Sequence, residues 1–493
     1  MTGGLIDHAH PPAWRNPVAS ETYDLVVIGA GPAGLTAAQE AVALGAKVAL
    51  VECHLIGGER LNAGCVPSKS IIRTARLYAE MRDAEDFGAQ VPGEIGIDFA
   101  AVMARMRRIQ SHLSRASSAW RLAEDGIAVH FGAACFIDVD RVAVAGQVLR
   151  FRKALIATGA RSLAPPIPGL AAAGYLTNQT IFELTECPRR LLVIGGGPLG
   201  CEMAQAFCRF GSHVILVQDE PMFLPKEERD AAQILSDALA RDGIEIHLNT
   251  AAVAVRCEGA GKIVELESGG DKFSVAVDQI AAGIGRVPNI DGLGLDAAGV
   301  QCGPQGWIQV DDFLRTSNRR IYAAGDVCLD YKFTHTAIAS ARIALGNALF
   351  RGRARFSKLT IPWCTYTDPE IAHVGLYVRQ AWDQGIPVRT FTILMQDVDR
   401  AVTDGETEGF VKIHVRHGTD RILGATIVAR HAGEMINGLS LAISSGIGLR
   451  ALGRVIHTYP TQAEAIKLAA EAYNRARLTP ALKARSERWL ASQ

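Results

Sequence analysis

Two stretches of the chain share one succession of hydrophobic and small residues. In the first, an apolar, β-branched run over Tyr23 to Ile28 precedes a glycine turn, Gly29 to Gly34, and an apolar helical stretch over Leu35 to Leu44. A short continuous apolar run bounded by glycine predicts a buried parallel strand. A second strand, over Lys47 to Val51, completes a strand, turn, helix and strand unit that ends at Glu52.

The same unit recurs as a strand over Leu191 to Ile194, a turn over Gly195 to Gly200, a helix through Phe210 and a strand over His213 to Val217. Both turns have the spacing G-x-G-x-x-G. The first glycine permits the tight turn, the second lets a pyrophosphate approach the backbone, and the third lets the helix pack on the strand. The sequence therefore predicts two dinucleotide-binding units.

The second unit is expected to be inserted within the first. An apolar strand from Lys153 ends at Thr158-Gly159, and the proline-rich stretch 165–169 follows it. Prolines favour extended backbone, which is typical of a domain boundary. A matching return runs from Gly283 to Asn289, and the buried strand that starts at Arg320 then delivers Asp326 at its end.

From about Ser357 the pattern changes to strands with hairpin chemistry. Two strands, over 410–416 and 422–429, flank a turn around Gly418, and helices are predicted over 433–445 and from Thr461. We therefore expect an α/β protein with two Rossmann-like dinucleotide-binding domains, the second inserted in the first, and a C-terminal α+β domain. The expected boundaries are 1–20 for an N-terminal tail, 21–164 with 286–353 for the first dinucleotide-binding domain, 165–285 for the second, and 354–493 for the C-terminal domain with its basic tail.

Composition and charge exclude several classes of function. The 493 residues include 51 basic and 51 acidic side chains, so no net field draws the protein to nucleic acid. The ten cysteines show no CxxC pair and no zinc-ligand spacing, so no metal site is predicted. No secretory signal and no run of about 18 apolar residues occurs, which favours a cytoplasmic protein without a transmembrane segment.

The motif from Gly57-Gly58-Glu59-Arg60 to Cys65-Val-Pro-Ser-Lys69 resembles that of the pyridine nucleotide-disulfide oxidoreductases, and the stretches 361–370 and 463–467 look closest to the mercuric-reductase-like branch. The resemblance runs from about Tyr23 to Tyr473 and implies bound FAD, NAD(P)H and a homodimer. It implies an FAD-binding domain over 21–164 and 286–353, an NAD(P)-binding domain over 165–285 and a dimerisation domain over 354–493. Together with the glycine turns it implies FAD contacts at Gly29, Gly31, Gly34, Glu52, Gly58, Lys69, Thr158, Gly159, Asp326, His335 and Ala337. The implied nicotinamide nucleotide contacts are Gly195, Gly197, Gly200, Gln218, Asp219 and Gly285.

The family moves a hydride through FAD to a disulfide between two cysteines, with a C-terminal His as acid and base. Here Arg60 stands at the first cysteine position, Cys65 remains, and Tyr459 replaces the His. The resemblance also implies a pair between Lys69 and Glu202 close to the flavin. Near Tyr459 we expect a hydrogen bond between the His457 ring and the Glu464 carboxylate. The candidate catalytic residues are Cys65, Lys69, Glu202, Arg60, Tyr459, His457 and Glu464.

We therefore expect an NAD(P)H-dependent flavoprotein oxidoreductase that reduces a non-disulfide acceptor such as a quinone, a metal species or another small oxidant. The alternatives are a soluble pyridine nucleotide transhydrogenase, a single-cysteine thiol or peroxide reductase, and a slow-turnover redox-sensing flavoprotein. NADH is favoured, because Gln218 is followed by acids and no Arg occurs before Arg229. The basic tail from Asn474 is expected to be a solvated helix rather than a segment that docks to a partner or a membrane surface.

Overall fold

The computed structural model describes residues 3–19, 22–90, 93, 95–259 and 261–493. Contacts divide the chain into two compact units, Met1–Asp219 with Ile246–Lys358, and Glu220–Glu245 with Leu359–Gln493. Residues 220–245, which the sequence analysis placed in the second nucleotide domain, thus group with the C-terminal part of the chain.

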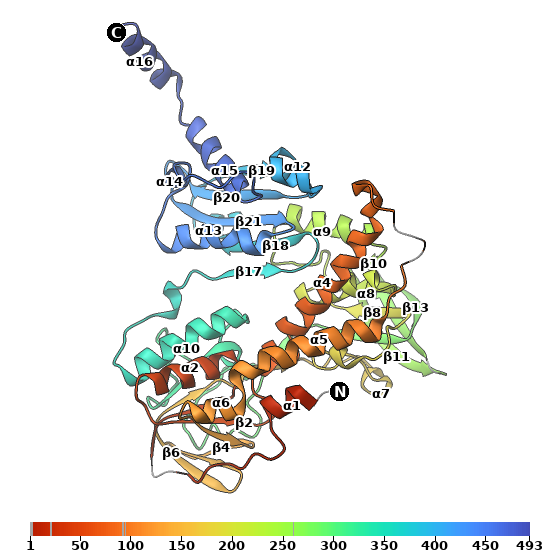
Figure 1. Ribbon diagram of the computed structural model, residues 1–493, viewed down its shortest axis with the longest axis vertical. Helices are drawn as coiled ribbons and strands as arrows, with labels where there is room; N and C mark the ends of the chain where they lie inside the picture. Colours follow the sequence, from red (N-terminus) through yellow and green to blue (C-terminus); the bar gives the residue numbers. More distant parts are fainter. Residues whose placement is uncertain (1–2, 20–21, 91–92, 94, 260) are drawn as a thin grey trace. The chain divides into compact units, whose positions relative to one another are not determined.

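The first part of unit 1 is a parallel sheet with the strand order β3-β2-β1-β6-β16 (Figure 1). These strands are β1 (Tyr23–Ile28), β2 (Val48–Glu52), β3 (Ala128–Phe131), β6 (Gln147–Ile156) and β16 (Ile321–Ala323). An antiparallel extension on β6 consists of β4 (Ala134–Asp138) and β5 (Arg141–Val144). The predicted strand over 23–28 is confirmed, and it is almost fully buried because β2 and β6 pair with its two edges.

Helices cover this sheet and carry most of the motif residues. They are α1 (Gly3–Ala9), α2 (Pro32–Ala43), α3 (Gly58–Asn62), α4 (Cys65–Arg82), α5 (Phe99–Ser114), α6 (Ala119–Glu124) and α10 (Thr334–Leu349). Residues 3–19, for which the sequence predicted a tail, include α1 and pack onto this part of unit 1.

The inserted part of unit 1 has its own four-stranded sheet, in the order β10-β9-β8-β14. Its strands are β8 (Arg190–Ile194), β9 (His213–Val217), β10 (Glu245–His247) and β14 (Gln279–Ala282), with helices α7 (Leu170–Ala173) and α8 (Pro198–Arg209). A separate antiparallel sheet is formed by β11 (Thr250–Glu258), β12 (Gly261–Ser268) and β13 (Asp271–Val277). The chain enters and leaves the insert through β7 (Ala160–Ser162) and β15 (Arg286–Pro288), which pair with each other.

Unit 2 is built on an antiparallel sheet with the order β17-β18-β21-β20-β19. Its strands are β17 (Pro362–Thr365), β18 (Glu370–Gly375), β19 (Val388–Leu394), β20 (Phe410–Arg416) and β21 (Ile422–Ala429). Its helices are α9 (Arg229–Arg241), α11 (Val378–Asp383), α12 (Asp399–Asp404), α13 (Ala432–Ser444), α14 (Leu449–Leu452), α15 (Glu464–Arg475) and α16 (Pro480–Leu490). The predicted hairpin strands over 410–416 and 422–429 are confirmed.

The C-terminal helix predicted from Thr461 is instead two helices, α15 and α16. A new helix starts at Pro480, which suits the first helical position because it needs no backbone N–H there. The Thr479 hydroxyl caps it by accepting a hydrogen bond of 3.2 Å from Leu482 N. No residue of α16 is buried.

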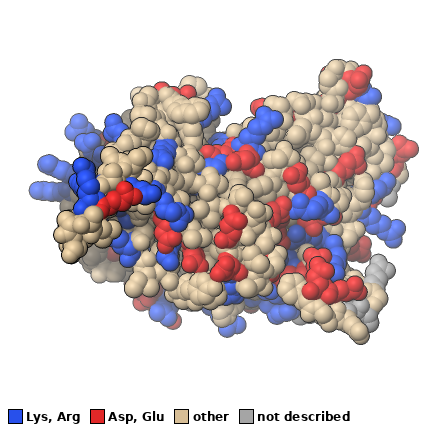
Figure 2. Space-filling model, turned by 90° about the horizontal axis from the view of Figure 1, so that it is seen from above, with Lys and Arg blue, Asp and Glu red and all other residues tan. Residues whose placement is uncertain are grey.

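Charged side chains of both signs are interspersed over the face seen in Figure 2, in keeping with the zero net charge. Within the residues that the structure describes, no helix is both long enough and apolar enough to cross a membrane.

Candidate functional site

The first glycine turn cannot carry larger residues. Gly29 has φ +101°, and a side-chain carbon there would collide with the carbonyl oxygen of Ala157. A side-chain carbon at Gly34 would collide with the carbonyl oxygen of Gly29, so helix α2 packs directly on the turn. The sequence pattern is thus required by the close approach of strand, turn and helix.

A second glycine loop faces the first. A side-chain carbon at Gly58 would lie 2.6 Å from Cα of Gly31, so the two backbones approach each other without side chains between them. Helix α2 starts at Pro32, and no side chain caps its first turn. The N–H groups of that turn and the helix dipole favour an anion such as a phosphate.

Glu52 ends β2 beside this loop and is only 8% exposed. Its Oε2 accepts a hydrogen bond of 2.7 Å from Ala30 N, and its Oε1 accepts one of 2.8 Å from His54 N. A carboxylate offers about four acceptor positions, so Glu52 holds the loop in place and still has capacity for a ribose hydroxyl.

The start of helix α10 also borders the site, beside the first glycine turn and Glu52. A side-chain carbon at Gly325 would lie 3.3 Å from Cβ of Ala337 and 3.5 Å from Cβ of Ala33, so the first turns of α2 and α10 meet at this glycine. Asp326 follows, and burial is the main reason that the pKa of its carboxyl is raised. His335 stacks on Phe333, with ring centroids 5.4 Å apart.

Two buried hydroxyl oxygens near these loops have no hydrogen-bond partner among the residues that the structure describes. They are Oγ1 of Thr158, in the turn Thr158-Gly159, and Oγ1 of Thr336, in the first turn of α10. An unpaired buried polar atom costs free energy unless a ligand or water satisfies it. The side-chain-free backbone cradle, the uncapped helix start and these hydroxyls together fit a dinucleotide such as FAD.

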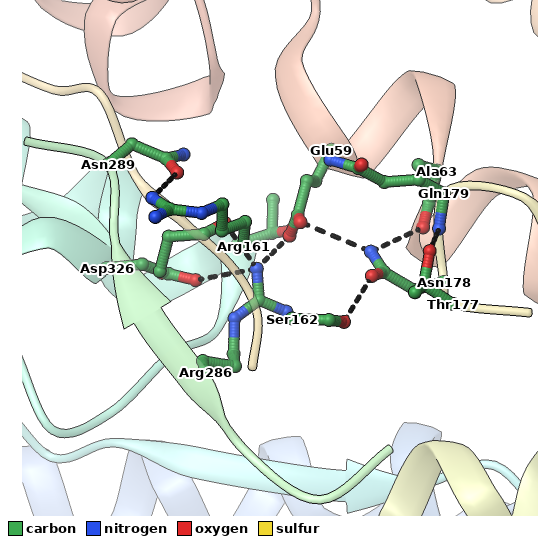
Figure 3. Close-up of polar contacts among 12 residues, drawn as sticks. Glu59, Ala63, Arg161, Ser162, Thr177, Asn178, Gln179, Arg286, Asn289 and Asp326 are labelled. Atoms are coloured by element: carbon green, nitrogen blue, oxygen red, sulfur yellow. Dashed lines mark hydrogen bonds and ion pairs between the residues drawn. The ribbon is translucent and has the colours of Figure 1, made fainter. Parts of the chain in front are cut away.

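A polar network that the sequence did not predict borders this site (Figure 3). Arg286 forms an ion pair with Glu59 and lies 3.8 Å from Oδ2 of Asp326. Glu59 Oε1 also accepts a hydrogen bond of 3.1 Å from Asn178, whose Oδ1 accepts one of 2.6 Å from Ser162. The network links α3 to both strands through which the chain enters and leaves the insert.

The structure brings Cys65 to the starts of two helices. Cys65 is exposed, is the first residue of α4, and its Sγ lies 3.7 Å from Oγ1 of Thr334, the first residue of α10. Arg60 is half-buried in α3, and its Nε is buried without a hydrogen-bond partner in the described protein. All ten cysteines are free thiols.

The ion pair expected between Lys69 and Glu202 is present. Lys69 Nζ donates to Glu202 Oε2 at 2.7 Å, and the side chains are 33% and 4% exposed. Lys69 lies in the second turn of α4 and Glu202 in α8, so the pair joins the two nucleotide-binding parts of unit 1. The nearly buried carboxylate holds the ammonium group in one position.

The second glycine turn repeats the geometry of the first. Gly195 has φ +104°, and a side-chain carbon at Gly200 would collide with the carbonyl oxygen of Gly195. Gln218 Oε1 accepts a hydrogen bond of 2.6 Å from Gly196 N, as Glu52 does from Ala30 N. Gln218 Nε2 in turn donates to Asp219 Oδ1 at 3.2 Å. Gly197 immediately precedes α8, and Gly285, with φ +145°, immediately precedes β15.

The C-terminal candidates lie in unit 2, and the described contacts include no hydrogen bond between the His457 ring and the Glu464 carboxylate. Among the described contacts, His457 Nδ1 lies 3.2 Å from Val455 O, and Glu464 lies 3.8 Å from Lys467. Glu464 starts α15, so its nearest cation is the lysine three residues later on the same helix face. Tyr459 instead donates to Asp399 Oδ2 at 2.8 Å.

Comparisons with known proteins agree with this architecture. Residues 23–341 match the family model described as pyridine nucleotide-disulphide oxidoreductase, and residues 361–470 match the dimerisation domain of the same family. Mercuric reductase from Lysinibacillus sphaericus is 34% identical over 93% of this chain and 84% of that protein. Dihydrolipoyl dehydrogenase from Thermus scotoductus is 33% identical over 92% of this chain and 98% of that protein.

A solved structure shows the same likeness. The Cu(II) complex of the HOCl-induced flavoprotein disulfide reductase RclA from Escherichia coli superimposes with a TM-score of 0.82 and 28% sequence identity. The superposition covers 92% of this chain and 100% of that one. Within the described residues, no group of three or more His, Cys, Asp or Glu side chains is placed to hold a metal ion.

Proposed function

This chain belongs to the pyridine nucleotide-disulphide oxidoreductase family, and on that premise we propose that it passes electrons from NAD(P)H, through FAD, to a small acceptor that is not a disulfide. It is a flavoprotein oxidoreductase, since FAD and NAD(P)H are the cofactors of this family. When bound, they supply hydride transfer from the nicotinamide to the flavin. The protein's own residues decide which acceptor is reached.

The observation that carries the proposal is the single thiol of the motif. Cys65 is exposed beside Thr334, and the position that the family uses for its first cysteine holds Arg60. An internal disulfide needs two thiols, so Cys65 by itself has no dithiol state to pass electrons through. The electrons must then leave the flavin for an external acceptor.

Arg60 favours an acceptor with oxygen atoms. Its Nε is buried and has no hydrogen-bond partner in the described part of the chain, and a guanidinium forms charge-assisted hydrogen bonds with a quinone oxygen or an anion. Electrons and protons balance when a quinone is the acceptor. NAD(P)H and one proton supply two electrons and two protons, which convert the quinone to a hydroquinone and leave the nicotinamide oxidised.

Metal ions are the second acceptor class in the proposal. The names of two similar proteins, mercuric reductase and the Cu(II) complex of RclA, associate those proteins with metal ions. Two Cu(II) ions would take one electron each from the reduced flavin. We place quinones first, because Cys65 is the only cysteine in the motif and soft metal ions prefer thiolate ligands.

Lys69 and Glu202 are proposed to act on the flavin rather than on the acceptor. A cation near the reactive edge of the flavin stabilises the negative charge that reduction creates. The Glu202 carboxylate, 4% exposed and 2.7 Å from Lys69 Nζ, positions that cation. Such a cation assists flavin reduction whichever acceptor follows, so its role does not require a disulfide.

The match of residues 361–470 to the dimerisation domain supports a homodimer. In our proposal the segment from His457 to Glu464 completes the partner's site. Tyr459 then forms a wall for the acceptor or, when its O–H turns away from Asp399, donates a hydrogen bond to it. NADH is the proposed donor: Gln218 binds Gly196 N and Asp219, and Asp219 adds a negative charge that would repel a 2′-phosphate.

Steady-state turnover with an acceptor panel tests the proposal. Purified FAD-loaded protein is supplied with NADH or NADPH and, in parallel, with a benzoquinone, Cu(II), Hg(II), a small disulfide such as lipoamide, hydrogen peroxide or thionicotinamide-NAD. We expect quinone reduction at least about tenfold faster than disulfide reduction, which corresponds to about 1.4 kcal/mol in the barrier.

The other acceptors in the panel identify the alternative functions. Fast lipoamide reduction contradicts the proposal, fast thionicotinamide-NAD reduction indicates a transhydrogenase, and fast peroxide reduction indicates a single-cysteine mechanism. Flavin that NADH reduces but that no acceptor reoxidises quickly indicates a redox sensor.

A further inference from the structure

The segment before β1, residues 3–19, is fastened to the rest of unit 1 along its length; we call it the N-terminal arm. It starts as α1, which packs closely on α5, since a side-chain carbon at Gly4 would lie 2.6 Å from Ser111 Oγ. At the last residue of α1, Ala9 O accepts a hydrogen bond of 3.0 Å from Ile56 N, and Ala9 is 1% exposed.

The arm then reaches the ends of two strands. The His10 ring stacks on Phe131, with centroids 4.0 Å apart and planes 9° from parallel, and His10 Nδ1 lies 2.6 Å from His54 O. Trp14 packs on Trp120, with centroids 4.8 Å apart. These contacts hold the arm against the edge of the sheet that carries the first glycine turn.

Farther along, the arm also pairs with backbone groups. Asn16 binds both polar groups of the Phe131 backbone: its Nδ2 donates to Phe131 O and its Oδ1 accepts from Phe131 N, each at 2.8 Å. Gln147 accepts a hydrogen bond of 2.7 Å from Ala19 N and donates one of 3.1 Å to Pro17 O. Such matched pairs fix the course of the arm rather than merely shielding an apolar surface.

What the arm holds is the connection between two cofactor-contact residues. Residues 53–56 join Glu52 to Gly57-Gly58, and the arm bonds the backbone of this connection at His54 and Ile56. Gly57 N donates to Ala30 O at 2.9 Å, so the connection also borders the first glycine turn. Phe131, under the His10 ring, is the register partner of Glu52 in the neighbouring strand.

We propose that the N-terminal arm is part of the FAD site and keeps FAD bound by preventing the connection 53–58 from opening. A surface connection opens locally when few contacts hold it. In this proposal FAD lies against the backbone cradle that Gly31 and Gly58 form, so opening of the connection removes one side of the site and lets FAD leave. The arm adds a ring stack and backbone hydrogen bonds that must break first, so it slows FAD release.

Two variants test the arm, a deletion of residues 1–19 and His10→Ala. The readout is the rate at which FAD fluorescence appears after the loaded protein is diluted into buffer with urea below the unfolding transition. We expect release about tenfold faster in the deletion and about threefold faster in His10→Ala, because ring stacks and single hydrogen bonds are each modest contributions. Far-UV circular dichroism confirms that both variants remain folded.

The matched control is Val18→Ser, on the same arm but 89% exposed, which should release FAD at the wild-type rate. A synthetic peptide of residues 3–19 should slow release from the truncated protein again. Unchanged release rates in both variants, with the fold intact, would overturn the inference. A lower melting temperature of the FAD-free protein without faster FAD release would overturn it too, because the arm would then stabilise only the fold. None of these readouts depends on the electron acceptor.

Discussion

Tyr459 donates a hydrogen bond of 2.8 Å from its phenol to Oδ2 of Asp399, the first residue of α12. The Tyr459 side chain is otherwise open to solvent, with the residue 65% exposed. The hydrogen bond to Asp399, followed by the charge of that carboxylate, raises the pKa of the Tyr459 phenol above its usual value. Tyr459 therefore keeps its proton throughout the neutral range and cannot serve as the base that the family's histidine provides.

Tyr459→Phe should affect the acceptor half-reaction more than flavin reduction. We expect NADH to reduce the flavin within about twofold of the wild-type rate, while reoxidation by quinone slows about tenfold, since a positioned proton donor contributes at least that much. Stopped-flow absorbance of the flavin measures both steps. Asp399→Asn, which removes the charge but keeps a hydrogen-bond partner, should show a smaller effect; equal slowing of both steps would contradict a role at the acceptor.

Anaerobic titration should bleach the flavin fully with one NADH equivalent per FAD. With Arg60 in place of the first cysteine, no disulfide is present to accept a further pair of electrons. Arg60→Cys restores the family's spacing to Cys65, and its oxidised form should require two equivalents and gain activity with lipoamide. Arg60→Ala is the control and should still need one. A wild-type requirement for two equivalents would reveal another redox centre.

Cys65→Ser should retain most quinone reductase activity. The thiol is exposed, and its one described side-chain hydrogen bond is with Thr334, which a serine hydroxyl can also form, so the substitution alters little. If the flavin delivers electrons directly, turnover should stay within about threefold of wild type, a change of less than 1 kcal/mol in the barrier. A loss of more than about tenfold, with FAD still bound, would instead support a single-cysteine mechanism.

Lys69→Met should slow flavin reduction by NADH. The variant removes the ammonium group that lies 2.7 Å from the Glu202 carboxylate, which is only 4% exposed. We expect a decrease of roughly 10 to 100-fold, comparable to loss of one electrostatic contact at a reacting centre. Arg73→Met, one turn farther along α4 at a side chain that is 54% exposed, is the control and should reduce normally. Equal rates in the two variants would exclude Lys69 from the flavin site.

Lys412→Met should reduce stability in a pH-dependent way. Burial acts to raise the pKa of the Glu228 carboxyl, but hydrogen bonds and charge from His414 and Lys412 outweigh it and lower the pKa to about 2, from 4.5. A carboxyl with a lowered folded-state pKa stabilises the fold above pH 4.5, and this contribution is lost as the pH falls towards 2.

Melting temperatures across pH 2.5 to 7 measure this effect. Lys412→Met should melt several degrees lower than wild type at pH 7, and the difference should shrink at the acid end. Lys272→Met removes an exposed ion pair, with the lysine side chain 57% exposed, and should change the melting temperature little at any pH. A constant difference across the range would show that Lys412 contributes through packing alone.

The local patterns of the sequence predicted the strands and glycine turns well. The strand over 23–28 is followed by a tight turn that needs glycine at positions 29 and 34, because a side-chain carbon at either position would collide with neighbouring backbone. The hairpin strands over 410–416 and 422–429 were equally clear from their apolar content and the turn between them. Interactions between residues close in sequence leave a periodic signal, which is why these elements were predictable.

Contacts between distant residues left no such signal. The pair of Arg286 with Glu59 joins positions far apart, and neither belongs to a pattern that indicates the other. The same holds for Tyr459 and Asp399, where family resemblance pointed to Glu464 and His457 instead. The arm was missed because residues 3–19 have three prolines and no amphipathic period, and their stability comes from rings and carbonyl groups elsewhere in unit 1.

Helix α9 also limits how this protein can be divided into fragments. Glu227, just before it, accepts hydrogen bonds of 2.6 Å from Tyr377 and 2.9 Å from Trp363, and Glu228 accepts one of 2.9 Å from Lys412. A fragment that ends at residue 353 would contain both G-x-G-x-x-G turns but would deprive both carboxylates, and the apolar side of α9, of their partners. Expressing the two nucleotide-binding parts alone should therefore give an aggregation-prone polypeptide, whereas a fragment that keeps the C-terminal sheet preserves the surface on which α9 folds.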